Sequence, residues 1–328
     1  GKETVYIYTD TGKMATAKSN DFEQEREYDT SSRVSVERCN GNEVIFQYDS
    51  DGIQKSTSFS DEIEIKRILD PENNELIITD PLGHEHHLQY DNEQCVSRIT
   101  SWGLTEKKDT DDNGRMITNE ITTANGYYAD KSRTRSYTYN AEDELTYLND
   151  SHLGHRYYGY DRASRLVGMS EGSDASALRY RYDDAGNLLR LPDGRGTLID
   201  GGNRLVRTGS TVYRYDMYGH LSEKSIGSST TRYYYDSAGL LLRVVYPDST
   251  ETLYTYDSYR RRITKEHNGT ITHFLWEQDR LVGECIGDSW KRLYIYGRKE
   301  DLVPCAFTDL TKKGDTWDGE SYAIHTDH

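Results

Sequence analysis

Aromatic and apolar residues alternate with polar ones over much of this chain, and aspartate and glycine interrupt the alternation at regular places. The clearest unit, Tyr180 to Leu189, reads Tyr-Arg-Tyr-Asp-Asp-Ala-Gly-Asn-Leu-Leu. Its two tyrosines lie on one face of a strand, where the ring packs on neighbours and the hydroxyl is expected to stay hydrated. The aspartate opens a turn because its side chain accepts a hydrogen bond from the backbone N–H two residues later, and the glycine supplies the positive φ. The pattern predicts a β-hairpin.

The hairpin unit repeats along the chain. Asp216 and Asp236 are 20 residues apart, and Asp236 and Asp257 are 21 residues apart, with a looser copy around Asp161 and a degenerate one at 199–206. A fixed period of this size is typical of repeat proteins. One hairpin is marginally stable alone, so neighbouring hairpins must pair side by side into a long antiparallel sheet. The residues to which we assign a structural role in the repeat are Tyr180, Tyr182, Asp183, Gly186, Tyr213, Tyr215, Asp216, Gly219, Tyr233, Tyr235, Asp236, Gly239, Tyr254, Tyr256 and Asp257.

The regularity of the repeat divides the chain into three segments. Residues 1–136 carry divergent repeats, and residues 137–307 carry well-formed ones. Residues 308–328 are predicted to begin a further C-terminal segment, with a polar loop over 308–320 between two strands.

Several short stretches of the first segment have predictions of their own. The stretch 80–83 (Asp-Pro-Leu-Gly) and the acidic stretch 109–114 are interpreted as turns, because the acidic stretch lacks the spacing and the final Glu of an EF-hand calcium loop. Asn125-Gly126 predicts a two-residue turn. The stretch 21–27 is the place where a helical turn or two could form.

Composition changes the expected architecture. Only 34% of the residues are apolar, and the chain has 28 Tyr against 5 Phe and 4 Trp. Leu, Ile and Val therefore look too sparse for a thick two-layer core. We expect an all-β chain whose sheet wraps into a shell or solenoid, with amphipathic tyrosines tiling one face. An ordinary β-sandwich with polar surfaces is the alternative.

The charge of the chain excludes several classes of partner. The formal net charge is −16, from 40 Lys and Arg against 56 Asp and Glu. Binding to nucleic acid or to anionic lipid depends on positive charge, so we expect neither. No stretch of about 18 apolar residues is present to span a membrane. No secretory signal opens the sequence.

Candidate chemistry is sparse. The cysteines, at 39, 95, 285 and 305, form no CxxC pair, which argues against structural zinc and favours reduced thiols in a protein made in a cytosol; a bridge between Cys285 and Cys305 is the alternative. His84-Glu-His86-His87 could seed a transition-metal site, but on a strand His87 faces away from the other two, so surface histidines are the favoured interpretation. Motifs for a phosphate loop or a nucleophilic serine are missing from the sequence. We therefore expect no catalytic, cofactor or metal site.

The copies of Tyr-x-Tyr-Asp-x-x-Gly-x-Leu between 137 and 265 resemble the tyrosine–aspartate (YD) repeats of the rearrangement hotspot (Rhs) proteins. Four later stretches resemble successive landmarks near the end of the conserved core of that family: 274–276 (Phe-Leu-Trp), 279–284 (Asp-Arg-Leu-Val-Gly-Glu), 294–297 (Tyr-Ile-Tyr-Gly) and 325–328 (His-Thr-Asp-His). The resemblance implies a sheet that spirals into a hollow cocoon, like the shell of animal teneurins, of which this chain forms an incomplete segment.

The resemblance also implies a function. In the family the shell is non-catalytic and encloses a C-terminal toxin domain, which type VI secretion or an insecticidal toxin complex delivers. The implied partners are that toxin domain, the remaining shell segments, and a secretion-spike or immunity protein. The protein would be made in the bacterial cytoplasm and then secreted or delivered to a target cell.

Two features of the family are expected to be absent from this chain. The family's aspartyl autoprotease segment, centred on Asp-Pro-x-Gly, is expected beyond His328, as is the toxin domain; Asp80-Pro-Leu-Gly83 lies too early in the chain to be that segment. Two other classes of function stay open. One is a surface or adhesion module that binds carbohydrate or a cell-surface partner, and the other is a polysaccharide hydrolase.

Overall fold

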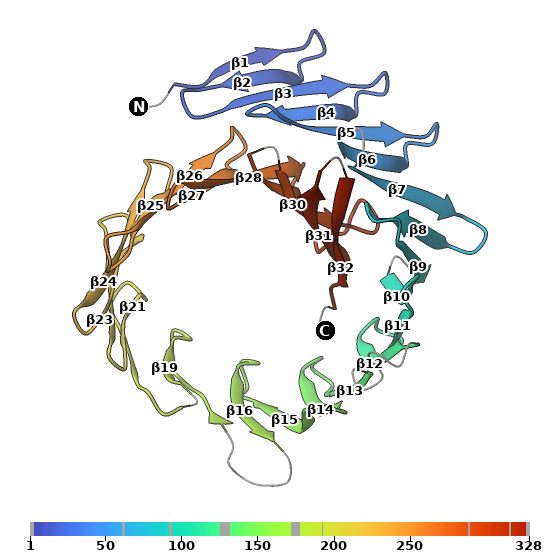
Figure 1. The fold of residues 1–328 in the computed structure, drawn as a ribbon. Helices are drawn as coiled ribbons and strands as arrows, with labels where there is room; N and C mark the ends of the chain where they lie inside the picture. Colours follow the sequence, from blue (N-terminus) through green and yellow to red (C-terminus); the bar gives the residue numbers. More distant parts are fainter. Residues whose placement is uncertain are drawn as a thin grey trace. The chain divides into compact units, whose positions relative to one another are not determined.

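A computed structural model describes residues 3–60, 63–91, 94–124, 132–171, 178–191, 193–287, 289–314 and 316–325. These residues form strands, turns and bends and no α-helix, so none of them forms a helix that could span a membrane. The all-β prediction is confirmed (Figure 1). The predicted turn at Asn125-Gly126 and the last three residues of the 325–328 stretch lie outside the described residues.

The chain forms two compact units. Unit 1 consists of Gly1–Trp102 together with Thr250–Asp327, and unit 2 consists of Gly103–Ser249. The strands of unit 1 are β1 (Val5–Tyr8), β2 (Met14–Lys18), β3 (Glu23–Tyr28), β4 (Val34–Cys39), β5 (Asn42–Tyr48), β6 (Gln54–Ser60), β7 (Ile63–Asp70), β8 (Glu75–Thr79), β9 (Glu85–Asp91), β10 (Gln94–Thr100), β26 (Glu251–Tyr256), β27 (Arg262–His267), β28 (Thr270–Glu277), β29 (Arg280–Ile286), β30 (Ser289–Ile295), β31 (Ala306–Lys313) and β32 (Thr316–Ala323).

Unit 2 contains shorter strands on average. They are β11 (Leu104–Thr110), β12 (Met116–Thr123), β13 (Arg133–Tyr139), β14 (Leu145–Asp150), β15 (Gly154–Tyr160), β16 (Leu166–Glu171), β17 (Leu178–Arg179), β18 (Arg181–Tyr182), β19 (Leu188–Arg190), β20 (Thr197–Ile199), β21 (Leu205–Thr208), β22 (Thr211–Tyr215), β23 (Leu221–Ile226), β24 (Ser229–Tyr235) and β25 (Leu241–Val245).

Strands that follow one another in sequence pair antiparallel. In unit 1 this holds from β1 to β10 and again from β26 to β32. In unit 2 it holds from β11 to β17, for β18 with β19, and from β20 to β25. The predicted side-by-side hairpins are therefore present in both units.

A β-bulge recurs immediately before the second tyrosine of the repeat. The register shifts between Arg181 and Tyr182 and between Arg214 and Tyr215, and the same shift precedes Tyr235. A bulge leaves one residue of the partner strand unpaired and increases the local twist. Because the bulge sits at the same place in successive repeats, each hairpin bends where its turn begins.

Unit 1 has a thicker core than the composition predicts. Figure 1 shows β28, β30 and β31 beside the strands β5 to β9, and residues of both groups form one buried apolar cluster. Ile65, Ile78, Leu293 and Ile295 are at most 1% exposed within it. The expectation that Leu, Ile and Val are too sparse for a thick two-layer core is thus wrong for unit 1. Unit 1 can form this core because the few aliphatic residues of the chain are concentrated in these strands.

Unit 2 has a much smaller apolar cluster among its described residues. Tyr137, Leu145 and Leu148 are buried together, with three partly buried neighbours packed against them. Most repeat tyrosines in this unit are half-buried and alternate with exposed residues, as in β22 and β24. Apolar burial therefore stabilises unit 2 less than unit 1, and polar contacts between repeats gain importance.

Two local predictions are wrong. The polar stretch 308–320 is a long hairpin of β31 and β32 rather than a loop, because Ala306, Thr308 and Leu310 alternate inward along β31 and are buried. The stretch 21–27 enters strand β3 and forms no helical turn, since Phe22 and Gln24 are both buried in the alternation of a strand.

Candidate functional site

The repeat turn is held by its aspartate. Asp183 Oδ1 accepts a hydrogen bond from the backbone N–H of Asn187 at 2.7 Å, and the backbone N–H of Gly186 donates to the carbonyl oxygen of Asp183 at 3.1 Å. Asp236 Oδ1 accepts the backbone N–H groups two and four residues on, each at 2.8 Å. Gly186 has a φ of +85°, the left-handed conformation that the sequence predicts for it.

The same turn forms in other repeats, including one that lacks the glycine. Asp216 and Asp257 each accept backbone N–H groups two and four residues on, at 2.9 Å. In the repeat of Asp257 the glycine is replaced by Arg260, which still takes a φ of +65°. The turn at Asp80 is equally regular, with Leu82 N–H donating to Asp80 Oδ1 at 2.9 Å. The prediction of a turn over residues 80–83 is confirmed.

In several repeats the second tyrosine connects the repeat to the one before it. The hydroxyl of Tyr182 donates to the carbonyl oxygen of Leu166 at 2.8 Å, and that of Tyr215 to the carbonyl oxygen of Leu205 at 2.9 Å. Both acceptors lie five residues after the aspartate of the preceding repeat. The same contact joins Tyr28 to Met14, Tyr48 to Val34, Tyr139 to Met116, Tyr160 to Leu145 and Tyr296 to Leu281. The expectation that these hydroxyls stay hydrated is wrong, because the bulge brings each one to a backbone acceptor.

An arginine four residues after the aspartate completes this connection. Arg165 Nε donates to Asp161 Oδ2 at 2.8 Å, while its guanidinium lies over the ring of Tyr182 in the next repeat, 5.0 Å from the centroid. Arg204 repeats the arrangement with Asp200 and Tyr215. A cation over a tyrosine ring adds attraction to the hydrogen bond. We call this aspartate–arginine–tyrosine chain the inter-repeat ladder.

The ladder tolerates other residues at the arginine position. His220 takes it after Asp216: its Nδ1 lies 3.1 Å from Asp216 Oδ2, and its ring stacks on Tyr235 with centroids 4.8 Å apart. Sequence reasoning missed the ladder position altogether. The available signal was Arg four residues after Asp, which recurs after Asp29, Asp111, Asp161, Asp200 and Asp257.

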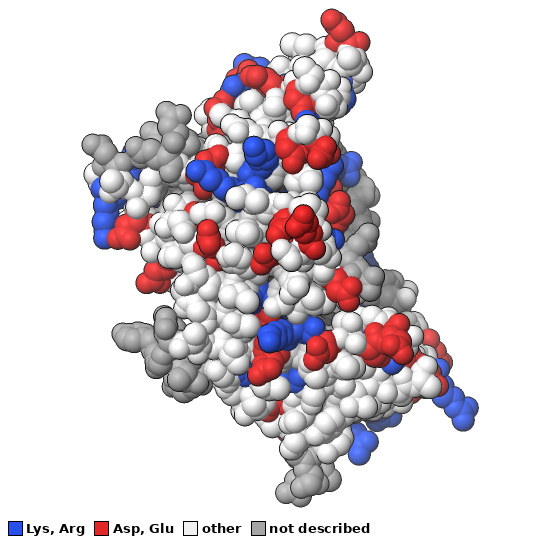
Figure 2. All heavy atoms as spheres, turned by 90° about the vertical axis from the view of Figure 1, so that its right-hand side faces the viewer, with Lys and Arg blue, Asp and Glu red and all other residues white. Residues whose placement is uncertain are grey.

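The ladder sets the protonation of its aspartates. Hydrogen bonds from the Arg165 guanidinium lower the pKa of Asp161, and those from Arg204 lower the pKa of Asp200. These carboxylates are therefore charged at neutral pH and engaged by a cation. Figure 2 shows acidic side chains interspersed with basic ones on one face of the molecule.

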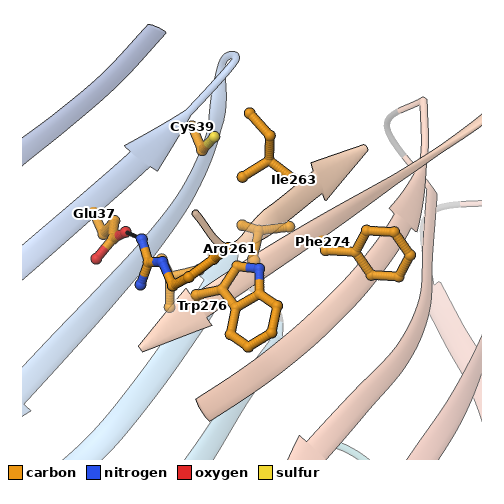
Figure 3. Close-up of a pocket in the computed structure, with 8 residues that line it drawn as sticks. Glu37, Cys39, Arg261, Ile263, Phe274 and Trp276 are labelled. Atoms are coloured by element: carbon orange, nitrogen blue, oxygen red, sulfur yellow. Dashed lines mark hydrogen bonds and ion pairs between the residues drawn. The ribbon is translucent and has the colours of Figure 1, made fainter. Parts of the chain in front are cut away.

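In unit 1 one ladder arginine is buried and serves two acids. Arg261 Nε donates to Asp257 Oδ2 at 2.7 Å, and its Nη2 lies 2.6 Å from Glu37 Oε1 on β4 (Figure 3). The side chains of these residues are at most 7% exposed. Trp276 takes the tyrosine position, with its Nε1 donating to the carbonyl oxygen of Arg262 at 2.9 Å. The pair Arg261–Glu37 thus joins the C-terminal strands of unit 1 to its N-terminal strands.

The repeat tyrosines that precede the ladder share its face. Tyr180, Tyr213, Tyr233 and Tyr254 are half-buried, two residues before the tyrosine of the ladder position. The guanidinium of Arg262 lies over the ring of Tyr254 at 4.2 Å. The side chains assigned to the repeat therefore lie in successive hairpins rather than around one pocket.

The histidine cluster has a different environment from the expected one. His86 is fully buried rather than on the surface, because its position on β9 faces the core of unit 1. His84 and His86 both pack edge-on against Trp102, with centroids 5.3 and 5.1 Å away, so they do share a face. Among the described residues no three His, Cys, Asp or Glu side chains are grouped as a metal would require.

The four cysteines are free thiols, and the Cys285–Cys305 bridge is not formed. Burial raises the pKa of Cys39 and of Cys305 to about 12. A thiol with such a pKa stays protonated at neutral pH, which makes it a poor nucleophile and a poor metal ligand.

The geometry defines a tandem β-hairpin repeat protein whose polar residues join one hairpin to the next. Residues 154–283 match the family model described as teneurin YD-shell. The chain is 30% identical over 189 residues to the double-stranded DNA deaminase toxin A of Burkholderia cenocepacia, covering 53% of this chain and 13% of that protein. It is 24% identical over 249 residues to the probable deoxyribonuclease RhsB of Dickeya dadantii, covering 73% of this chain and 16% of that protein.

A solved structure shares the fold. The Photorhabdus luminescens Tc holotoxin pore matches over 98% of this chain and 24% of the compared chain, with a TM-score of 0.53 and 12% sequence identity. These similarities support an Rhs/YD-repeat shell fragment. The chain spans less than a fifth of the length of the two curated relatives described above.

Proposed function

We propose that this chain is a non-catalytic shell segment of an Rhs-type bacterial polymorphic toxin, and that the complete shell encloses a C-terminal toxin domain and helps to deliver it. One observation carries this proposal, namely the inter-repeat ladder. Its aspartates, arginines and tyrosines are bonded to each other and to the backbone across successive repeats. Residues so engaged suit a wall better than a catalytic site.

The physical properties of the sheet support a wall that holds a cargo. Consecutive pairing of hairpins covers strand edges that would otherwise pair with an unfolded guest. The half-buried tyrosines and the paired charges place many polar groups on the sheet surface, to which a cargo would adhere weakly. Both properties suit a container that must later release its content.

Partners and delivery follow from the same proposal. The curated relatives described above are named as a toxin and as a probable deoxyribonuclease. By analogy we assign this chain a C-terminal toxin domain and further shell segments as partners, with a secretion-spike or immunity protein as an additional one. The protein would be made in the bacterial cytoplasm and exported by type VI secretion or within an insecticidal toxin complex.

Each of the three segments predicted from the sequence has a place in the proposed shell. Residues 137–307 would form the regular part of the shell wall, residues 1–136 a divergent part of the same wall, and residues 308–328 the start of the C-terminal segment of the core. The autoprotease and the toxin would lie outside residues 1–328.

The test is to express the natural gene that contains this segment and to analyse the product by denaturing gel and mass spectrometry. We expect a discrete C-terminal fragment, released beyond His328, that co-purifies with the shell under native conditions. A single uncut chain whose tyrosine repeats are open to protease and bind glycan probes would contradict the proposal. That outcome would favour an adhesion module.

A further inference from the structure

Unit 1 contains a cavity that the shell role does not require. Its volume is about 760 Å³, and residues from both sequence segments of unit 1, 13–76 and 277–300, line it. Cavities that bind small molecules in proteins have volumes of roughly 300–1,000 Å³. The cavity is therefore large enough for a ligand with several functional groups.

The charge of the lining is opposite to that of the chain. Seven Lys or Arg side chains and three carboxylate side chains line the cavity, although the chain carries a net charge of −16. Three of the arginines have acidic partners: Arg26 with Glu37, Arg33 with Asp29, and Arg280 with Glu277. The other four cations have no carboxylate within ion-pair distance among the described residues. They are Lys13, Arg67, Arg298 and Lys299.

Arg67 is the most informative of these four. It follows Ile63 and Ile65 on the inward face of β7, and only 8% of it is exposed. Its Nη1 donates to Thr57 Oγ1 at 3.0 Å, and no other hydrogen bond is found for its guanidinium among the described residues. Burial lowers the pKa of Arg67, since the charge is removed from water. A buried guanidinium without a direct ion pair costs several kcal/mol, by order of magnitude, and an anion would offset that cost.

Glu277, the acid whose charge acts on Arg67, is already engaged by other side chains. Glu277 Oε1 accepts from Gln54 Nε2 at 2.9 Å, and Glu277 Oε2 pairs with Arg280 Nη2. Arg298 belongs to the C-terminal segment of the lining: its Nη2 donates to Asn74 Oδ1 at 2.8 Å, and its guanidinium lies over the ring of Tyr90, 3.9 Å from the centroid. Each of these contacts leaves other guanidinium N–H groups for a ligand, because arginine has five.

The aromatic rings of the lining favour a charged ligand over a stacking one. Lys13 lies over the ring of Tyr28 at 5.0 Å, and Arg33 lies over the ring of Tyr48 at 4.5 Å. One face of each lining tyrosine is thus already covered by a cation. What the cavity presents to a ligand is positive charge and fixed N–H donors, the groups that bind phosphate and carboxylate.

We propose that this cavity binds a small polyanion, a molecule with two or more phosphate or carboxylate groups, through the buried Arg67 of β7 and through Arg298 and Lys299 of the C-terminal lining segment. Two or more groups are required because the unpaired cations come from separate segments of the chain. The site is distinct from the inter-repeat ladder and needs no cargo or further shell segment.

The experiment is isothermal titration calorimetry of the 328-residue chain with pyrophosphate and, in a separate arm, with citrate. We expect one site with a Kd below about 1 mM for at least one probe, weakened by added NaCl as charge pairing requires. The two arms distinguish a phosphate ligand from a carboxylate ligand.

Variants locate the site. Arg67→Met and Arg298→Met should each weaken binding by about tenfold or more, the effect of losing one charge-assisted contact. Arg38→Met is the matched control: it removes the same charge from unit 1, but Arg38 lies on β4 outside the cavity lining. It should change the Kd less than about twofold. If circular dichroism shows that the Arg67→Met variant does not fold, the Kd of the Arg298→Met variant tests the proposal.

Three outcomes would overturn the proposal. The first is no binding of either probe at the stated affinity. The second is binding that Arg38→Met weakens as much as the cavity variants do, which would indicate general charge attraction. The third is binding of an oligo-glutamate peptide by a chain that binds neither small probe, which would assign the cavity to an acidic protein partner.

Discussion

The hydroxyl of Tyr182 donates a hydrogen bond of 2.8 Å to the carbonyl oxygen of Leu166, and so joins the start of one repeat turn to the return strand of the repeat before it. The bond lies at the bulge, where the strand register shifts between Arg181 and Tyr182. A backbone carbonyl in this position would otherwise depend on water. Each repeat therefore stabilises the next through a side chain as well as through strand pairing.

Removing this hydroxyl should destabilise unit 2 locally. We expect Tyr182→Phe to cost about 1 kcal/mol, the net value of one such hydrogen bond. Urea unfolding monitored by hydrogen exchange in β16 and β18 measures the loss. Tyr180→Phe is the control, because the Tyr180 hydroxyl has no hydrogen bond among the described residues. Equal losses in the two variants would contradict the role assigned to Tyr182.

The turn glycine should resist β-branched substitution for conformational reasons alone. Gly186 has a φ of +85°, and a Cβ added there meets no atom within 4 Å. Gly186→Val should therefore cost about 1–2 kcal/mol through backbone strain, and Gly186→Asn should cost less, because Asn tolerates this region. The melting temperatures of the Gly186→Val and Gly186→Asn variants, measured by thermal unfolding, test this order.

Gly159→Val is the matched control for the turn glycine. Gly159 also has open space around its Cβ position, and its φ lies outside the left-handed region. An unchanged melting temperature for Gly186→Val, or a larger loss for Gly159→Val, would refute the turn assignment.

The buried arginine of unit 1 should matter more than an exposed ladder arginine. Arg261→Met leaves the carboxylates of Glu37 and Asp257 without their cation in a buried place, which should cost about 3–5 kcal/mol. Arg204→Met removes the equivalent contact where the side chain is 40% exposed, and should cost much less. Denaturant unfolding of both variants measures the difference. Adding Glu37→Gln to Arg261→Met should recover part of the loss, and no recovery would argue against the ion pair.

The ladder aspartates should make stability depend on acid pH. Hydrogen bonds from Arg165 lower the pKa of Asp161 in the folded chain below the unfolded value of about 3.9. The pair therefore contributes its full stability above about pH 4, and the contribution is lost as the pH falls through the folded pKa.

Asp161→Asn isolates this effect. Asn140 occupies the same turn position naturally, and its Oδ1 accepts the backbone N–H groups of Glu142 and Glu144. The variant should keep the turn but lose the ion pair, so its urea midpoint should lie below that of the natural chain at pH 6 and approach it near pH 2. A difference in urea midpoint that stays constant from pH 6 to pH 2 would show that protonation of Asp161 does not change the stability of the fold.

The repeat, the hairpins and the turns can all be predicted from the sequence alone. Tyr182, Asp183 and Gly186 specify their local structure because strand alternation, an aspartate cap and a positive φ depend on residues within one hairpin. The family resemblance rested on the same short-range pattern, and so did the interpretation of Asp80 to Gly83 as a turn.

Which hairpins pack together across long sequence distances depends on tertiary packing and could not be predicted. Arg261 bonds Glu37, 224 residues away in sequence, and Ile78 shares a core with Leu293. The alternation along one strand says which face is apolar but not which other face covers it. For the same reason the sequence does not predict that the guanidinium of Arg67 is buried without an ion pair, because this depends on which strands pack around it.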